Sequence, residues 1–105
     1  MHYNTEASGV LDLVKMFGER LKKRKEVVEV WLFGSWAYGN PASESDIDIG
    51  LVCNGEIGLA SELDYFREGQ DFDSRIEVVT FEKRRFELAR HSLIKEIKEK
   101  GIRIA

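Results

Sequence analysis

The stretch that decides the fold begins with Trp-Leu-Phe-Gly-Ser at residues 31–35 and resumes, ten residues later, with Asp-Ile-Asp-Ile at residues 46–49. This order predicts a strand that ends in a Gly-Ser turn, followed by a second strand that opens with two carboxylates. Side chains alternate between the faces of a strand, so Asp46 and Asp48 are expected on the same face. Two neighbouring carboxylates repel each other and lose hydration, which is costly unless a cation lies between them. The pair therefore predicts a cation site.

The length and composition of the chain restrict its class. With 105 residues, 43% of them hydrophobic and 33% charged, it is expected to form a single domain over residues 1–105. Its net charge of −3 argues against a protein that binds nucleic acid directly by neutralising phosphates. There is no signal-peptide pattern and no apolar run near the ~20 residues of a membrane span. The single cysteine, Cys53, excludes an internal disulfide and fits a reducing compartment. We therefore expect the protein to be cytoplasmic and not associated with a membrane.

Hydrophobic periodicity predicts helices and strands in alternation. We expect helices over residues 7–25, 35–38, 58–68 and 81–100, the last broken near residues 91–92. Strands are expected over residues 27–33, 46–52, 75–80 and 102–104. The fold class is accordingly α/β (α+β), a small mixed β-sheet flanked by helices. The basic runs at residues 22–25 and 83–85 are interpreted as solvated faces, and the isolated His2 and His91 as surface or packing residues.

A third acid, Glu77, lies inside the predicted strand over residues 75–80. A charge in a core strand is seldom placed there without a partner, which favours Glu77 over Asp71 and Asp73 in the preceding polar segment. If Glu77 converges with Asp46 and Asp48 at one end of the sheet, three hard oxygen ligands result. Such ligands suit Mg²⁺, or Mn²⁺, together with substrate phosphates.

The turn at Gly34 and Ser35 completes the predicted site. Backbone N–H groups at the start of a short helix provide a place for phosphate oxygens. Backbone N–H groups that bind phosphate, placed beside a set of metal-binding carboxylates, form a phosphoryl- or nucleotidyl-transfer site. In such a site metal ions neutralise charge on the α-phosphate and activate the attacking oxygen.

The Gly34-Ser35 pair, ten residues, and then Asp46-Ile47-Asp48 resemble the Gly-Ser-x10-Asp-x-Asp signature of the DNA polymerase β-like nucleotidyltransferase superfamily. The resemblance extends over residues 27–80, and the short length resembles the minimal nucleotidyltransferases of that superfamily. It implies the polymerase β-like fold, with ATP as substrate and two Mg²⁺ ions. It also implies that Asp46, Asp48 and Glu77 are the catalytic and metal-binding residues, and that Gly34 and Ser35 contact the nucleotide phosphates.

The chain departs from the family pattern at two places. Members commonly carry Arg where this chain has Trp36 and Tyr38, and Glu77 stands where a third Asp is usual. The first change removes cationic phosphate contacts from the turn, and the second adds one methylene to a metal ligand. We expect Trp36 and Tyr38 to pack under the loop rather than to stack on a base.

Minimal nucleotidyltransferases of this size resemble the antitoxin half of two-gene modules whose other half is a helical HEPN-type ribonuclease toxin. The resemblance implies a protein adenylyltransferase of a type VII toxin–antitoxin module, which transfers AMP from ATP to a tyrosine of the toxin. One alternative is a non-catalytic docking subunit that neutralises or completes a helical partner. Another, less favoured because no acceptor-binding half is recognised, is nucleotide transfer to a small molecule such as an aminoglycoside. The acceptor, the base and a homo-oligomeric state stay open.

Overall fold

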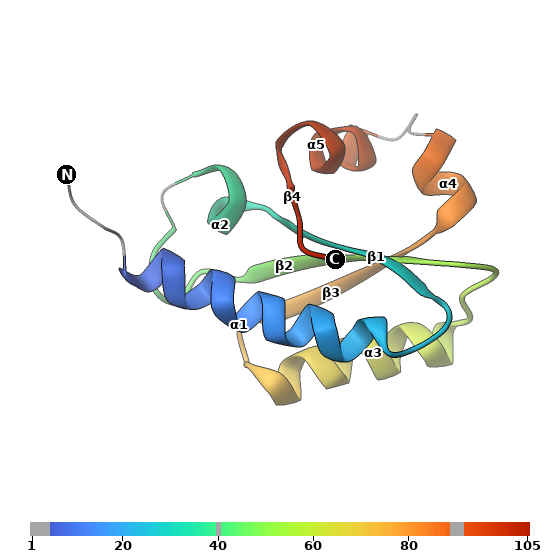
Figure 1. Ribbon diagram of the computed structural model, residues 1–105, viewed down its shortest axis with the longest axis horizontal. Helices are drawn as coiled ribbons and strands as arrows, with labels where there is room; N and C mark the ends of the chain where they lie inside the picture. Colours follow the sequence, from blue (N-terminus) through green and yellow to red (C-terminus); the bar gives the residue numbers. More distant parts are fainter. Residues whose placement is uncertain (1–4, 40, 89–91) are drawn as a thin grey trace.

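The computed structural model describes residues 5–39, 41–88 and 92–105, so His2 and His91 lie outside the described residues (Figure 1). The elements are, in order, α1 (Thr5–Lys22), β1 (Val27–Phe33), α2 (Ser35–Tyr38), β2 (Ile47–Cys53), α3 (Leu59–Phe72), β3 (Ile76–Glu82), α4 (Lys83–Leu88), α5 (Ser92–Lys100) and β4 (Ile102–Arg103). The predicted helices and strands are therefore present. Several boundaries differ from the predicted ones, most clearly at three places: α1 ends before residue 25, α3 continues to Phe72, and β3 continues to Glu82 where a helix was expected.

The strands form one mixed sheet in the order β3-β2-β1-β4. β1 is antiparallel to β2 and β4, whereas β2 and β3 are parallel. A parallel pair needs a crossover connection, and α3 provides it between β2 and β3. Figure 1 shows α1 and α3 on one side of the sheet and α4 and α5 on the other. The predicted fold class, a small mixed sheet flanked by helices, is confirmed.

The larger hydrophobic core lies between the sheet and the pair α1 and α3. Alternate residues of β2 face it, and four of them are at most 1% exposed: Ile47, Ile49, Leu51 and Cys53. Cys53 is a free, buried thiol. A smaller core on the opposite face joins β1 and β2 to α4 and α5 through Phe33, Val52, Phe86, Ile94 and Ile97. The two cores leave one end of this second face to polar residues.

Helix α3 turns its hydrophobic repeat outward. Its residues Leu59, Leu63 and Phe66 recur at helical spacing but are 71%, 47% and 40% exposed. The side that packs on the sheet carries Tyr65 and Gly69 instead. A Cβ at Gly69 would lie 2.8 Å from the Ile76 side chain, so the glycine lets the helix approach β3 closely. The repeat predicted the helix correctly, but it does not mark the buried face.

The basic runs are mainly solvated, as expected: residues 22, 23, 25 and 83–85 are exposed. Arg24 is the exception, because it pairs with Glu68 of α3 and lies 4.8 Å from the ring centre of Tyr65. It therefore ties the end of α1 to α3. None of the helices in the described part of the chain has the length and hydropathy that a membrane span requires.

Candidate active site

Two of the predicted acids lie side by side on neighbouring strands. In the parallel pair of β2 and β3, Asp48 is in register with Glu77. Side chains at paired positions point to the same face of a sheet, with the strands about 4.8 Å apart. On its other side Asp48 is paired with Phe33, the last residue of β1, and Gly34 follows directly. The sheet topology thus brings Gly34, Asp48 and Glu77 into one corner.

The carboxyl group of Asp48 is held in an environment that disfavours its charge. Burial, together with the negative charges of Glu77 and Asp46, raises the pKa of Asp48 to about 6. Within the described residues, Asp48 forms no ion pair with a basic side chain. A cation placed beside Asp48 would therefore relieve both the lost hydration and the repulsion.

Gly34 is required by the position of Asp48. Its backbone has φ 76° and ψ −160°, a region that is essentially open to glycine alone. A Cβ at residue 34 would lie 2.1 Å from Oδ2 of Asp48. The carboxylate therefore occupies the space that any side chain at residue 34 would need. Ser35, which begins α2 immediately after this contact, is exposed. The Gly-Ser turn and the Asp-x-Asp strand are thus one structural unit.

Tyr38 and Glu96 also approach this corner, and the sequence analysis did not assign either to the site. Burial raises the pKa of the Tyr38 phenol, and the charges of Glu96 and Asp48 add to the rise, whereas a hydrogen bond from the Gly34 backbone opposes it. Tyr38 is 37% exposed, so the expected packing under the loop is wrong for this residue. Glu96 belongs to α5, and no local pattern in the sequence could connect it to Asp48.

The carboxylates in this corner suit a divalent metal ion whose coordination is completed by substrate phosphates. They do not form a metal site from protein ligands alone. Among the described residues, no three His, Cys, Asp or Glu side chains are grouped closely enough to enclose a metal ion. Asp46 is exposed, just before β2, and acts on Asp48 through its charge. Mg²⁺ is usually held by one or two carboxylates, with water and substrate phosphates completing its coordination. Asp48 and Glu77, with Asp46 nearby, supply carboxylates of the required type.

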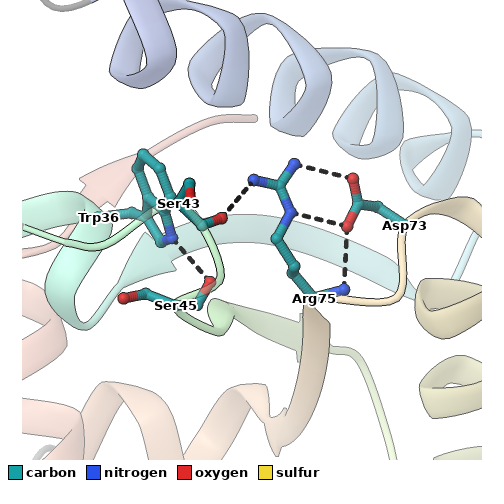
Figure 2. A network of polar contacts seen from close by, with 5 residues as sticks. All are labelled: Trp36, Ser43, Ser45, Asp73 and Arg75. Atoms are coloured by element: carbon teal, nitrogen blue, oxygen red, sulfur yellow. Dashed lines mark hydrogen bonds and ion pairs between the residues drawn. The ribbon is translucent and has the colours of Figure 1, made fainter.

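The two alternatives to Glu77, Asp71 and Asp73, precede β3 and are not paired with Asp48. Asp73 accepts hydrogen bonds from Nε and Nη2 of Arg75 at 3.0 and 2.9 Å (Figure 2). Hydrogen bonds from Arg75 lower the pKa of Asp73, which keeps it ionised and paired. Asp71 lines a depression on the surface of α3 together with Arg20 of α1. Glu77 is therefore the later acid that the fold brings beside Asp48.

The ten-residue segment between the two halves of the motif is held by side chains at its base. Trp36 is 8% exposed, and its Nε1–H donates a hydrogen bond of 3.0 Å to the Ser45 carbonyl (Figure 2). The expectation that Trp36 packs under the loop is confirmed. Arg75 Nη1 donates a hydrogen bond of 3.0 Å to the Ser43 carbonyl from the other side. No pattern in the sequence singled out Arg75, which directly precedes β3.

A comparison with protein families matches residues 17–104 to the polymerase beta nucleotidyltransferase family. The chain belongs to this family. The pairing of Asp48 with Glu77 and the contact of Asp48 with Gly34 are consistent with this class of protein. A sequence search of curated proteins finds no match.

Several solved structures share the fold. A chain of a toxin–antitoxin complex with AMP-PNP is 18% identical, with a TM-score of 0.66, covering 90% of this chain and 73% of that one. A Sulfolobus solfataricus protein described as a nucleotidyltransferase is 19% identical, with a TM-score of 0.60 and coverages of 94% and 82%. A chain from the complex of tri-AMPylated Shewanella oneidensis HEPN toxin with MNT antitoxin is 13% identical, with a TM-score of 0.54 and coverages of 96% and 70%. At these identities the likeness establishes the fold alone.

Proposed function

We propose that this chain is a Mg²⁺-dependent nucleotidyltransferase that transfers AMP from ATP to a tyrosine of a helical HEPN-type toxin in the cytoplasm. The observation that carries the proposal is the position of Asp48. It is in register with Glu77, and its carboxylate occupies the space that a side chain at residue 34 would need. A desolvated carboxylate flanked by like charges is the arrangement that a nucleotidyl-transfer site needs before metal and nucleotide bind. Membership of the nucleotidyltransferase family supports the same reaction class.

In this mechanism Asp46, Asp48 and Glu77 would hold Mg²⁺ or Mn²⁺, two ions in all, once ATP is bound. The metal supplies charge neutralisation at the α-phosphate. Gly34 leaves room for the Asp48 carboxylate by lacking a side chain, and the N–H groups of Gly34 and Ser35 orient the triphosphate oxygens. Glu77 accepts the proton of the incoming tyrosine hydroxyl. The new bond forms between that oxygen and the α-phosphorus, the bond to the β-phosphate bridging oxygen breaks, and pyrophosphate leaves.

The choice of acceptor is supported by the solved structures that share the fold. Three of them are toxin–antitoxin complexes, one with AMP-PNP and one with a tri-AMPylated HEPN toxin. These ligands and partners belong to those proteins. They make a toxin tyrosine the acceptor to test first for this chain.

The test is transfer of label from α-labelled ATP to a HEPN-type toxin mixed with this protein, in the presence of Mg²⁺. We expect Asp48→Asn to lower the rate by about 10³-fold or more, because it removes a metal ligand at the reacting phosphate. Asp64→Asn is the matched control, since Asp64 is exposed on α3 and distant in the sequence from the motif. Equal labelling by wild type and Asp48→Asn, or none by wild type, would contradict the proposal.

A second candidate, neutralisation of a helical partner by docking alone, is favoured by one observation. Leu59, Leu63 and Phe66 form an exposed apolar surface on α3. A docking subunit needs such a surface and does not need metal. Calorimetry distinguishes the two: partner binding unchanged in Asp48→Ala, with no binding of Mg²⁺ and ATP by the wild type, would favour docking.

A further inference from the structure

We propose that Arg75 is a positioning residue that fixes Asp46 by holding the chain on both sides of it. The side chain of Arg75 donates from Nη1 to the Ser43 carbonyl at 3.0 Å. Its own main-chain carbonyl accepts the Ile47 N–H at 2.7 Å. Asp46 lies between these two attachment points. The inference rests on the proposed function only in assigning Asp46 to the metal.

A third attachment lies immediately before Asp46. The Arg75 guanidinium lies 5.9 Å from the ring centre of Trp36, whose Nε1–H donates to the Ser45 carbonyl (Figure 2). Ser45 also closes the turn, because its Oγ accepts the Ala42 N–H at 2.9 Å. Arg75 therefore holds Ser43 with its side chain and Ile47 with its main-chain carbonyl. It also packs on Trp36, which in turn holds Ser45.

Asp46 depends on these attachments because its own side chain is exposed. An exposed carboxylate gains little from packing, so its position relative to Asp48 is set by its backbone. The segment that precedes it would otherwise be a surface loop with many accessible conformations, and ordering such a loop costs conformational entropy. Holding the loop in advance removes that cost from metal binding.

The surroundings of Arg75 favour this role over direct recruitment of phosphate. Asp73 accepts from both Nε and Nη2 of Arg75, so the positive charge is compensated locally. A shallow depression of about 570 Å³ beside it is lined by more acidic than basic residues, namely Ser43, Glu44, Asp46, Asp73, Ser74 and Arg75. The planar fork of Arg reaches Asp73 and Ser43 at once, which a Lys ammonium cannot reproduce. Arg75→Lys should therefore behave like Arg75→Met.

The first test uses the metal-free protein and the two indole N–H signals in its NMR spectrum. We expect Arg75→Met and Arg75→Lys to shift the Trp36 signal and to speed its hydrogen exchange about tenfold. The Trp31 signal is the internal control, because its Nε1–H bonds to Glu29 on β1. Arg84→Met, at an exposed position of α4, should move neither signal. An unmoved Trp36 signal in Arg75→Met would overturn the proposal.

The second test measures Mn²⁺ affinity in the presence of a non-hydrolysable ATP analogue. We expect Arg75→Met to weaken it about tenfold, as the loss of a residue that orients a metal ligand does. In the Asp46→Asn background the same change should add little, because the ligand that Arg75 positions is already lost. Full rescue by Arg75→Lys would show that charge matters rather than position, and would overturn the proposal.

The two tests separate this inference from the proposed function. If the wild type binds no Mn²⁺ with nucleotide, the proposed function fails, while the Trp36 signal still decides whether Arg75 holds the loop. If Arg75→Met does not fold, Asp73→Asn replaces it, since this change keeps the guanidinium but removes the carboxylate that orients it. The same shift of the Trp36 signal is then expected, and its absence would count against the proposal.

Discussion

The face of the sheet under α1 and α3 is covered along β2, whereas the opposite face is covered in part by α4 and α5 (Figure 1). The opposite face also carries Asp48 and Glu77, which are paired across β2 and β3. On β2, Ile47 and Ile49 are fully buried, while Asp48 between them faces the other way and is only partly buried. Val79, two residues after Glu77 on β3, is 38% exposed. One strand therefore has a closed hydrophobic face and a partly open polar one.

This difference explains how the fold tolerates unfavourable charges at the site. Each fully buried isoleucine contributes roughly 1.5–3 kcal/mol to stability. The charge repulsion and lost hydration around Asp48 are unfavourable and cancel part of that stabilisation. Hydrophobic burial on the closed face thus offsets the unfavourable charges on the open face, where a cation could bind.

The largest effect is expected in the closed face. Ile49→Ala should lower the free energy of unfolding by about 2–5 kcal/mol, because it leaves a cavity where the side chain was completely buried. Val79→Ala, on the open face, is the matched control and should cost far less. Urea denaturation of both variants measures the contrast, and similar losses would show that the two faces are equally packed.

Gly34→Ala should have the next largest effect, about 1–3 kcal/mol of unfolding free energy, because alanine strains this backbone conformation. The new methyl group also displaces the Asp48 carboxylate, so metal affinity should fall as well. Gly55→Ala tests the backbone alone, because Gly55 has φ 84° with nothing within 4 Å of an added Cβ. Loss of stability without loss of Mn²⁺ binding in Gly34→Ala would show that its contact with Asp48 is not needed for the site.

A smaller effect is expected from pH. The pKa of Asp48 is raised to about 6 in the folded protein, so its ionised form destabilises the fold above that pH. The penalty is present at pH 7 and is relieved as pH falls through about 6 toward the unfolded pKa near 4. Asp48→Asn should therefore be more stable than wild type at pH 7 by about 1 kcal/mol after solvent screening.

Denaturant unfolding at pH 7 and pH 5 measures that gap, which should shrink at the lower pH. Below pH 4 the opposite trend takes over, because Asp73 has a lowered pKa and its pairing with Arg75 is lost on protonation. A gap between wild type and Asp48→Asn that does not change between pH 7 and pH 5 would contradict the raised pKa.

The smallest effect is expected on the outside of α3. Leu63→Gln should change the free energy of unfolding by no more than about 0.5 kcal/mol, because Leu63 is 47% exposed. Leu51→Gln places the same substitution in the closed face, where Leu51 is fully buried, and should be severely destabilising. Thermal melts compare the two. A large loss from Leu63→Gln would mean that the exposed repeat of α3 contributes to the core after all.

Local pattern predicted the centre of the molecule well. The strand over residues 27–33 and the short helix over residues 35–38 have the predicted bounds. The Asp-x-Asp alternation placed Asp48 on the face opposite Ile47 and Ile49, as a strand requires. Family membership, recognised from the spacing of these residues, is confirmed over residues 17–104. The roles of Gly34, Ser35, Asp46, Asp48 and Glu77 in metal and nucleotide binding stay predictions.

The sequence by itself determined the elements, the fold class and the Gly-Ser and Asp-x-Asp pair, because these depend on spacing along one stretch of chain. Only the tertiary structure decided which residues meet across the sheet. It set Glu77 beside Asp48, brought Glu96 near Tyr38, and tied Arg75 to Ser43 over 32 residues of chain. It also turned the hydrophobic repeat of α3 outward, because the close approach at Gly69 decides which side of the helix can pack on β3.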